Sequence, residues 1–226
     1  MGRGTEKQPL VSEDWLSRFH PEVMPVEHQA VLRRLAPLAS EAHFYLGGGT
    51  AVAIMLGHRR SLDLDWFTPN ALADPAQLVA ALEAQNLSIE VTATSRGTLH
   101  AIADGVRLSW LEYRYPLIQP LQRWSDYECS LASREDLICM KLSAITSRGA
   151  KRDFIDLHAL AGTDLRLREM LDLYRRKFGL EEVASVVTSL TYFDDADEEA
   201  DPSMIWKLEW SDVKQTFERW VNDYVD

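Results

Sequence analysis

The sequence predicts an α+β fold in which a mixed sheet with flanking helices precedes a C-terminal helical part. Between residues 41 and 115, short runs such as LSIEVTATS, TLHAIAD and VRLSWLEYRY alternate apolar and polar side chains and end at Gly, Asn or Asp, as strands do. From residue 133 onward, apolar residues recur at steps of three and four, which is the period of helices. We therefore expect a helical lead-in over residues 1–42, a sheet region over 43–130 and a helical region over 131–226.

Composition limits the classes of protein to consider. The chain has 226 residues, of which 46% are hydrophobic, so it can bury a sizeable core. Its apolar runs, such as AVAIML, are far shorter than the ~20 residues of a membrane helix, and MGRGTEKQPLVSEDW lacks the apolar core of a secretory signal. These features predict a cytoplasmic protein with no membrane partner. The net charge of −11 opposes wholesale attraction to nucleic acid, because Lys and Arg bind phosphate backbones, so any such contact must be local.

Two further features receive simple structural interpretations. Cys129 and Cys139 are ten residues apart, a spacing that fits neither a disulfide scaffold nor a zinc pair, so both are predicted to be buried apolar residues. The acidic run DDADEEAD at 194–201 precedes Pro202 and predicts a solvated connector, although such a run can also shield a basic surface or mimic nucleic acid.

A triple glycine lies between an apolar strand-like run, HFYL, and a helix-like run, TAVAIML. Gly47, Gly48 and Gly49 therefore form a turn that directs backbone N–H groups and the positive end of a helix dipole to one place, as in phosphate sites. Thr50 adds a hydroxyl that either caps the helix or contacts a phosphate oxygen. A glycine turn with Thr50 as a plain cap is the alternative.

Two aspartates follow in RRSLDLDWF. On a strand, alternation places Ser61, Asp63 and Asp65 on one face and apolar side chains on the other. Carboxylates on one face repel each other unless water or a cation screens them, and Mg²⁺ is the cation that oxygen ligands favour. The preceding His58, Arg59 and Arg60 are suited equally to phosphate contact and to a polar turn.

At this point the residues carry a family resemblance. GGTAVAIMLGHRRSLDLDWFT resembles the first motif of the DNA-polymerase-β-like nucleotidyltransferase superfamily, and in detail that of the AbiEii/AbiGii toxin family. ASREDLICMKLSAITSRGAKRDFIDLHAL, at 132–160, is similar to that family's later signature of a helical Lys, a basic turn and an Asp-x-x-Asp helix. The resemblance covers most of 45–160. It implies a polymerase-β-like catalytic sheet region at 43–130, a nucleoside triphosphate substrate and Mg²⁺ or Mn²⁺ as cofactor.

The second signature also has a physical interpretation. Lys141 and Arg148 are seven residues apart and share one helix face, which we expect to be partly exposed and able to hold a triphosphate or an acceptor. Asp153 and Asp156 are three residues apart on the next helix, where one or both are expected to meet Lys141 or the acceptor hydroxyl. The alternative is that Asp153 caps its helix and Lys141 reaches water.

The resemblance implies a role for each matching residue. The implied catalytic residues are Asp63, Asp65, Lys141, Asp153 and Asp156. The implied nucleotide-binding residues are Gly48, Gly49, Thr50, Ser61, Lys141 and Arg148. The implied metal ligands are Asp63 and Asp65. One departure concerns a third metal carboxylate, because GVRLSWLEYRYP offers Ser109 at the candidate position, and Glu112 is a weak candidate on the opposite face of a regular strand.

The implied activity is transfer of a nucleoside monophosphate to an acceptor, such as the 3′ end of tRNA or a protein, by the toxin of a type IV toxin–antitoxin pair. A cognate antitoxin is the implied partner. Two alternatives stay open: a small-molecule nucleotidyltransferase of the antibiotic-modifying kind, and a non-catalytic nucleotide-binding regulatory module, which the missing carboxylate favours slightly.

The remaining features lie outside the motifs. In MIWKLEWSDVKQTFERWVNDYVD, aromatic residues at three- and four-residue steps predict a helix of about five turns that docks on the helical part, or alternatively binds a partner. The other histidines show no ligand spacing and are expected at the surface or in local hydrogen bonds; they are His20, His28, His43, His100 and His158.

Overall fold

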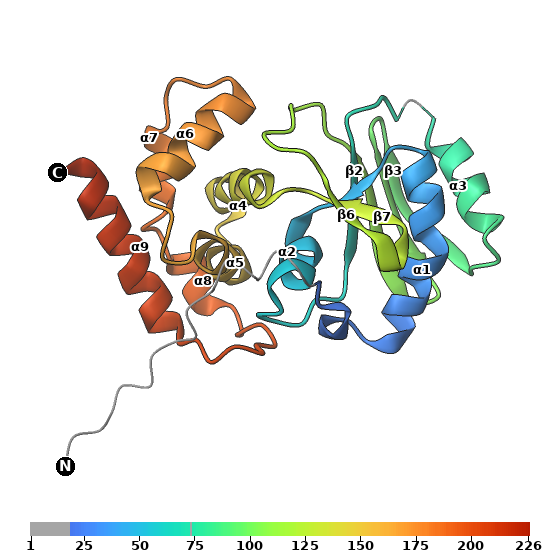
Figure 1. Ribbon diagram of the computed structural model, residues 1–226, viewed down its shortest axis with the longest axis horizontal. Coiled ribbons are helices and arrows are strands. Elements are labelled where there is room, and N and C mark those ends of the chain that lie inside the picture. The colour runs from blue at the N-terminus through green and yellow to red at the C-terminus, as the bar shows by residue number, and fades with distance from the viewer. Residues whose placement is uncertain (1–18, 73) are drawn as a thin grey trace, which may run out of the picture.

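The computed structural model describes residues 19–72 and 74–226 (Figure 1). The first 18 residues of the expected lead-in lie outside the described residues. Its described part contains a 3₁₀ turn, Pro21–Val23, and helix α1, Val26–Glu41. Within the described residues, no helix combines the length and the apolar character needed to cross a membrane.

A seven-stranded sheet forms one half of the molecule. Its strands, in spatial order, are β3 (Ile89–Ser95), β4 (Thr98–Ala103), β5 (Val106–Glu112), β2 (Leu64–Thr68), β1 (Tyr45–Leu46), β7 (Cys129–Leu131) and β6 (Gln122–Trp124). β2 is parallel to β5 and β1 is parallel to β7, whereas the other pairs are antiparallel. The predicted mixed sheet is confirmed. β6 and β7 were not expected, since three residues are too few to show a period.

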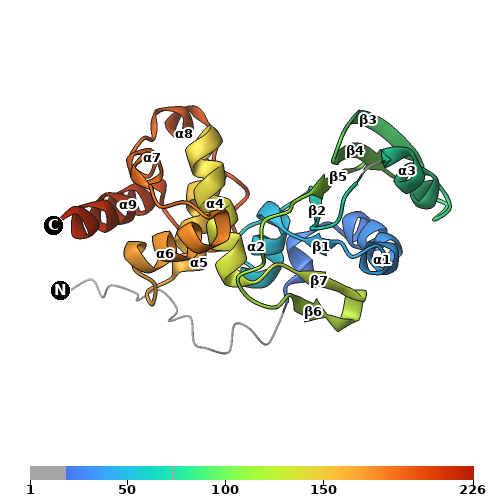
Figure 2. The ribbon, with the colours of Figure 1, turned by 90° about the horizontal axis from the view of Figure 1, so that it is seen from above.

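The central strands alternate as their sequence predicts. Leu64 and Trp66 of β2 are fully buried, and Trp66 stacks on Trp110 of β5 with ring centroids 5.3 Å apart. Asp65, between them in sequence, lies on the other face. Helix α1 packs against β7, and α3 (Pro75–Glu83) packs against β3 (Figure 2).

Helices form the other half of the molecule. They are α4 (Arg134–Arg148), α5 (Lys151–Ala161), α6 (Leu167–Phe178), α7 (Ala184–Ser189), α8 (Asp194–Glu198) and α9 (Trp210–Val225). Helix α4 begins where the Ser133 hydroxyl accepts the N–H of Asp136, and it ends at Gly149 with φ +59°.

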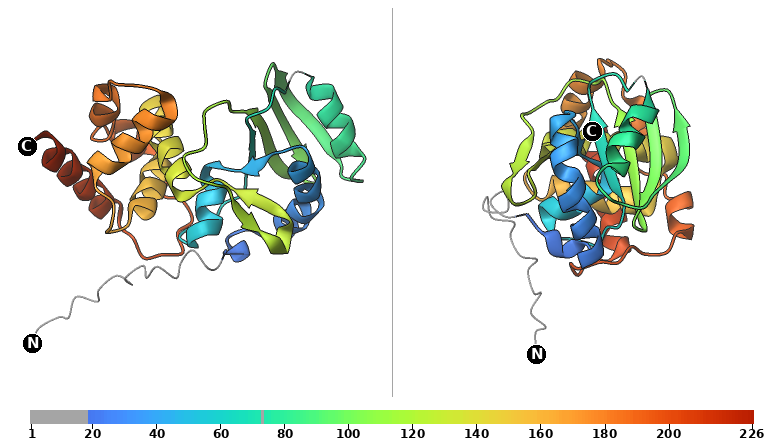
Figure 3. Two further views of the ribbon diagram at one scale, coloured as in Figure 1. Left: turned by 45° about the horizontal axis from the view of Figure 1, so that its top comes forward. Right: turned by 90° about the vertical axis from the view of Figure 1, so that its right-hand side faces the viewer.

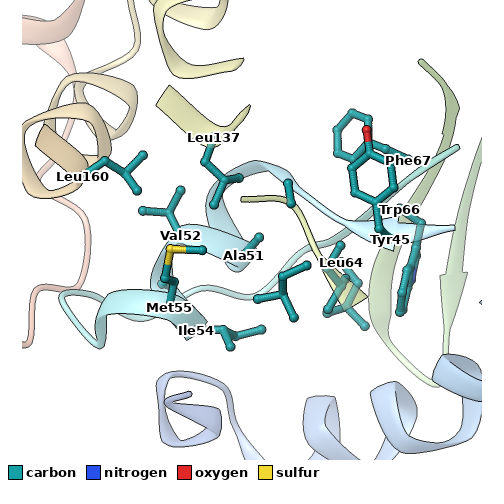
Figure 4. Close-up of a cluster of buried hydrophobic side chains, with 14 of the residues drawn as sticks. Tyr45, Ala51, Val52, Ile54, Met55, Leu64, Trp66, Phe67, Leu137 and Leu160 are labelled. Carbon is teal, nitrogen blue, oxygen red and sulfur yellow. The ribbon is translucent and has the colours of Figure 1, made fainter. Parts of the chain in front are cut away.

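Helix α2 (Gly48–Leu56) joins the two halves. All of its side chains from Thr50 to Leu56 are buried, and the helix contacts both α4 and α5. Figure 4 shows Val52 and Met55 directed toward Leu137 and Leu160 of these helices. A residue at the start of α2 therefore lies between the sheet and the helical half.

The C-terminal helix docks on the chain's own helices, as predicted, but it begins at Trp210 and leaves Trp206 outside it. Val213 and Phe217 are fully buried, and the Phe217 ring lies 5.2 Å from that of Phe154 on α5. Figure 3 shows this helix, in red, along the outside of the helical half.

The acidic run at 194–201 is mostly exposed and connects α7 to α9, as a solvated connector would, but it is also ordered by specific contacts. Part of the run forms α8, and Asp197 accepts hydrogen bonds from the Trp210 indole and from Lys214. Lys151 donates to the Glu199 carbonyl and to Asp201. The next residues, 203–206, form backbone hydrogen bonds with residues 58–60. The acidic run thus accepts hydrogen bonds from Lys151, Lys214 and Trp210. It is followed by a segment whose backbone pairs with the turn before β2.

The two cysteines are buried and unpaired, as predicted. Burial raises the pKa of both Cys129 and Cys139 to about 12, which makes both thiols unreactive at neutral pH.

Candidate active site

The glycine turn brings the N-terminus of α2 against a carboxylate. Gly47 is the N-cap residue, and Gly48 has φ +62°, a conformation that favours glycine. A Cβ atom on Gly48 would lie only 2.6 Å from Oδ2 of Asp65. Because the first N–H groups of a helix have no partner within the helix, this turn presents hydrogen-bond donors beside Asp65.

Thr50 forms hydrogen bonds within the protein. Its hydroxyl lies 2.7 Å from the Ser61 hydroxyl and also donates to the Asp63 carbonyl, so it does not cap the helix. Both Thr50 and Ser61 are buried. Their hydroxyls fasten α2 to the segment that leads into β2.

Asp63 and Asp65, which we call the carboxylate pair, lie at the start of β2. The Asp63 side chain is 37% exposed, and its Oδ1 accepts a 2.7 Å hydrogen bond from Nε of Arg107 on β5. Burial raises the pKa of Asp65; the Ser109 hydroxyl opposes this effect, and the neighbouring Asp63 adds to it. The carboxylate pair is therefore incompletely neutralised by the protein.

Strand β5 supplies no third acid beside the pair. Ser109 is the direct cross-strand partner of Asp65, and Nδ1 of His100 on β4 lies 3.2 Å from its hydroxyl. Glu112 pairs in register with Thr68 and accepts hydrogen bonds from the Leu72 backbone and from Arg114. Glu112 is three positions after Ser109, and an odd step along a strand reverses the side-chain direction, so Glu112 belongs to the opposite face.

The second predicted group is a buried cluster rather than an exposed basic face. We call it the ion cluster; its members are His58, Arg59, Lys141, Arg148, Asp153 and Asp156. Lys141 is only 3% exposed, so the expectation of a partly exposed Lys141 was wrong. Its Nζ lies 2.8 Å from Asp153 and 2.7 Å from Asp156. The expected meeting of both aspartates with Lys141 is confirmed, and Asp153 does not cap its helix.

Arg59 and His58 complete the cluster around Asp156. Nε and Nη2 of Arg59 lie 2.6 and 2.7 Å from the two Asp156 oxygens, and Nε2 of His58 lies 2.7 Å from Oδ1. Although burial opposes ionisation, attraction to Lys141 and Arg59 holds the pKa of Asp156 well below its usual value. Burial lowers the pKa of His58. Asp156 is therefore a permanently ionised acceptor with cationic partners on both oxygens.

Arg148 is the member of the ion cluster that reaches the surface. Its side chain is 53% exposed, and Nε lies 2.8 Å from Oδ2 of Asp153. The pKa of Asp153 is lowered because attraction to Lys141 and the hydrogen bond from Arg148 outweigh its burial. Lys141 and Arg148 thus share a helix face, as predicted, and both form ion pairs with Asp153.

The first turn of α2 links the two groups. A Cβ on Gly49 would lie 2.6 Å from Nη2 of Arg59 and 3.5 Å from Oδ2 of Asp156. Gly48 and Gly49 therefore allow the carboxylate pair and the ion cluster to approach successive residues of the same helical turn.

The donor set near Asp65 is suited to a hard divalent cation. It offers carboxylate oxygens, which Mg²⁺ and Mn²⁺ prefer, and Asp65 carries a raised pKa that a nearby cation would lower. Among residues 19–72 and 74–226, no group of three His, Cys, Asp or Glu side chains surrounds a common point. Asp63 and Asp65 are the two carboxylates of this region that could hold such a cation.

Comparison with known proteins gives the family. The model of the family described as nucleotidyl transferase AbiEii toxin, type IV TA system, matches residues 105–224, just over half of the chain. The chain belongs to the AbiEii family. The predicted resemblance is confirmed, and the AbiEii chain is accordingly a nucleotidyltransferase. The match begins at Gly105, so it includes the second motif but not the carboxylate pair.

Relatives of this AbiEii chain cover more of its length. It is 34% identical over 204 residues to the Aquifex aeolicus (strain VF5) protein aq_aa25, described as uncharacterized. The aligned residues cover 88% of this chain and 97% of that protein. MenT4, a nucleotidyltransferase toxin of Mycobacterium tuberculosis H37Rv, has a TM-score of 0.58 at 14% identity over 88% of this chain and 83% of that one. An H. pylori protein classed as a nucleotidyltransferase has a TM-score of 0.53 at 16% identity over 90% and 94%. These two structures confirm the fold.

Four residues of the site, Arg107, His100, His58 and Arg59, were missed or left undecided by sequence reasoning. Arg107 and His100 reach the site through pairing between β2, β5 and β4, and no local pattern distinguishes them from other strand residues. Arg59 was considered for phosphate contact, but its guanidinium is buried against Asp156. The polar run before β2 was the only signal for it.

Proposed function

We propose that this nucleotidyltransferase is the toxin of a type IV toxin–antitoxin system and uses Mg²⁺ or Mn²⁺ to move a nucleoside monophosphate from a nucleoside triphosphate to an acceptor. The approach of Gly48 to Asp65 carries the proposal, because N–H groups at a helix N-terminus are suited to phosphate and the neighbouring carboxylate oxygens are suited to a divalent cation. The acceptor is the 3′ end of tRNA or a protein, and pyrophosphate leaves. The implied partner is a cognate antitoxin.

In this proposal, Asp63 and Asp65 hold the cation, and the N–H groups of Gly48 and Gly49 bind phosphate oxygens. A bound divalent cation would supply positive charge to the reacting phosphate. Thr50 and Ser61 have buried, mutually bonded hydroxyls, so we assign them the task of fixing α2 relative to Asp63 rather than binding phosphate.

The ion cluster positions the site instead of moving protons. A carboxylate whose pKa is held well below its usual value is a weak base, so Asp156 is assigned as a structural partner and not as the general base. Lys141 holds Asp153 and Asp156 against α2, and its field reaches Asp65. Arg148, which remains half exposed, is the member that can also meet a phosphate.

The proposal is tested by incubating the purified protein with each α-labelled triphosphate, Mg²⁺ and total cellular RNA or protein. Label in tRNA supports the proposal, and label in a protein band selects the other acceptor. Label only in small molecules would favour the antibiotic-modifying alternative, and triphosphate binding without turnover would favour the regulatory module. The Asp63→Asn variant is the matched control and should transfer no label.

A further inference from the structure

Strand β5 faces the carboxylate pair with a cation and a hydroxyl. Ser109 lies directly opposite Asp65, and Arg107, two residues earlier and so on the same face, donates to Asp63. The Ser109 hydroxyl already has a partner on each side, Asp65 and His100. A guanidinium and an engaged hydroxyl, and no carboxylate, therefore face the pair from this strand.

Charge balance follows from this arrangement. One divalent cation neutralises the two carboxylates, and the guanidinium of Arg107 then remains to meet the negative charge of a triphosphate. A second divalent cation at the same place would lie against Arg107 with no additional acidic ligand among the described residues.

We infer that the carboxylate pair binds one divalent cation rather than two, and that Arg107 supplies the positive charge at the place of a second. Arg107 bonds to Asp63 before substrate arrives and to the triphosphate afterwards. This inference rests on the proposed function and deepens it.

The exposure of Arg107 permits this exchange. Its side chain is 70% exposed, and such ion pairs contribute little, so little is lost when the guanidinium leaves Asp63. A planar guanidinium also forms paired hydrogen bonds with phosphate oxygens, which makes it suitable for the second position.

The first test counts cations. Mn²⁺ is titrated into the protein with a non-hydrolysable triphosphate analogue and followed by electron paramagnetic resonance. One Mn²⁺ per chain, lost in Asp63→Asn, is expected. Two Mn²⁺ per chain in the wild type would overturn the inference and leave the proposed function intact. If no Mn²⁺ binding depends on Asp63, the metal site of the proposed function itself is wrong.

The second test changes the strand. Ser109→Asp places an acid opposite Asp65 and should add a second Mn²⁺ to the titration. Arg107→Gln should tighten Mn²⁺ binding without triphosphate by up to about fivefold, the range of an exposed ion pair, and should weaken binding of the analogue. Arg114→Gln is the matched control, since Arg114 is an equally exposed, ion-paired residue near the end of β5. If Arg107→Gln leaves the affinities for Mn²⁺ and for the triphosphate analogue at the values of the control variant, the proposed role of Arg107 is wrong. Thermal melting checks that each variant is folded.

Discussion

The carboxylate pair and the ion cluster approach successive glycines of the first turn of α2, yet they differ in how their charge is balanced. The pair has one exposed guanidinium beside two carboxylates. The ion cluster surrounds two carboxylates with three cationic side chains and a histidine, almost all buried. Burial, together with the nearby Asp63, raises the pKa of Asp65, whereas cationic partners outweigh burial and lower the pKa values of Asp153 and Asp156.

This difference separates two tasks that residue types alone do not separate. A carboxylate already matched by buried cations stabilises the fold and has little remaining attraction for a metal. A carboxylate next to another acid, with incomplete neutralisation, destabilises the metal-free fold slightly and attracts a cation. Removing charge should therefore have opposite effects on stability in the two groups.

The largest effect is expected for Lys141→Met. It leaves Asp153 and Asp156 buried without a shared cation, and breaking a buried ion pair costs about 3–5 kcal/mol. Urea denaturation measures the loss. Lys214→Met is the control, because its pair with Asp197 is partly exposed and should be worth less than about 1 kcal/mol. Equal effects for the two variants would mean that the ion cluster is not a structural unit.

Gly48→Ala tests the place where the two groups meet. At this position alanine would have to adopt φ +62°, and its methyl group would lie 2.6 Å from Oδ2 of Asp65. We therefore expect the free energy of unfolding to fall by about 1–3 kcal/mol and Mn²⁺ binding to weaken. Gly105→Ala shares a positive φ, +83°, but has no neighbour within 4 Å, so it reports backbone strain alone. If the two variants lose the same stability and the same metal affinity, the contact with Asp65 is unimportant.

Asp65→Asn should stabilise the metal-free protein by up to about 1 kcal/mol, because it removes a like-charge repulsion in a buried place. A raised pKa means that the folded state holds its proton more tightly than the unfolded chain. The destabilisation is thus present above the raised pKa and disappears as pH falls to the unfolded value of about 3.9.

Denaturation in EDTA between pH 4 and 8 measures this trend. The advantage of Asp65→Asn should shrink as pH falls. Asp156→Asn should instead be less stable than the wild type by a constant amount across this range, because the folded-state pKa of Asp156 is lowered. The wild type loses this extra stability only below about pH 3.9. An advantage of Asp65→Asn that is constant with pH would exclude ionisation as its cause.

The smallest effect on stability is expected for Asp63→Asn. Asp63 is partly exposed and its partner is mostly exposed, so the free energy of unfolding should change by no more than about 0.5 kcal/mol. Nucleotide transfer should nevertheless be abolished. A folded Asp63→Asn protein with wild-type transfer would remove Asp63 from the active site.

The sequence by itself determined the features that depend on neighbours within one element. Alternation identified β3, β4 and β5, and three- and four-residue steps identified α4, α5 and α6, because side-chain direction along a strand or helix has a fixed period. The same reasoning placed Asp65 opposite its buried neighbours and joined Lys141 to Arg148 on one helix face.

Tertiary structure alone decided how the charges are matched. Arg59 and Asp156 are 97 residues apart, and their contact arises because α2 packs between the sheet and α5. The pairing of β2 with β5 likewise brings Arg107 to Asp63 and Ser109 to Asp65. A charge is balanced by whichever group is near it in space, whereas periodicity in the sequence gives only the direction of a side chain within one element. The sequence therefore indicated the acidic and basic residues of a site, but it did not show which of them are neutralised by others.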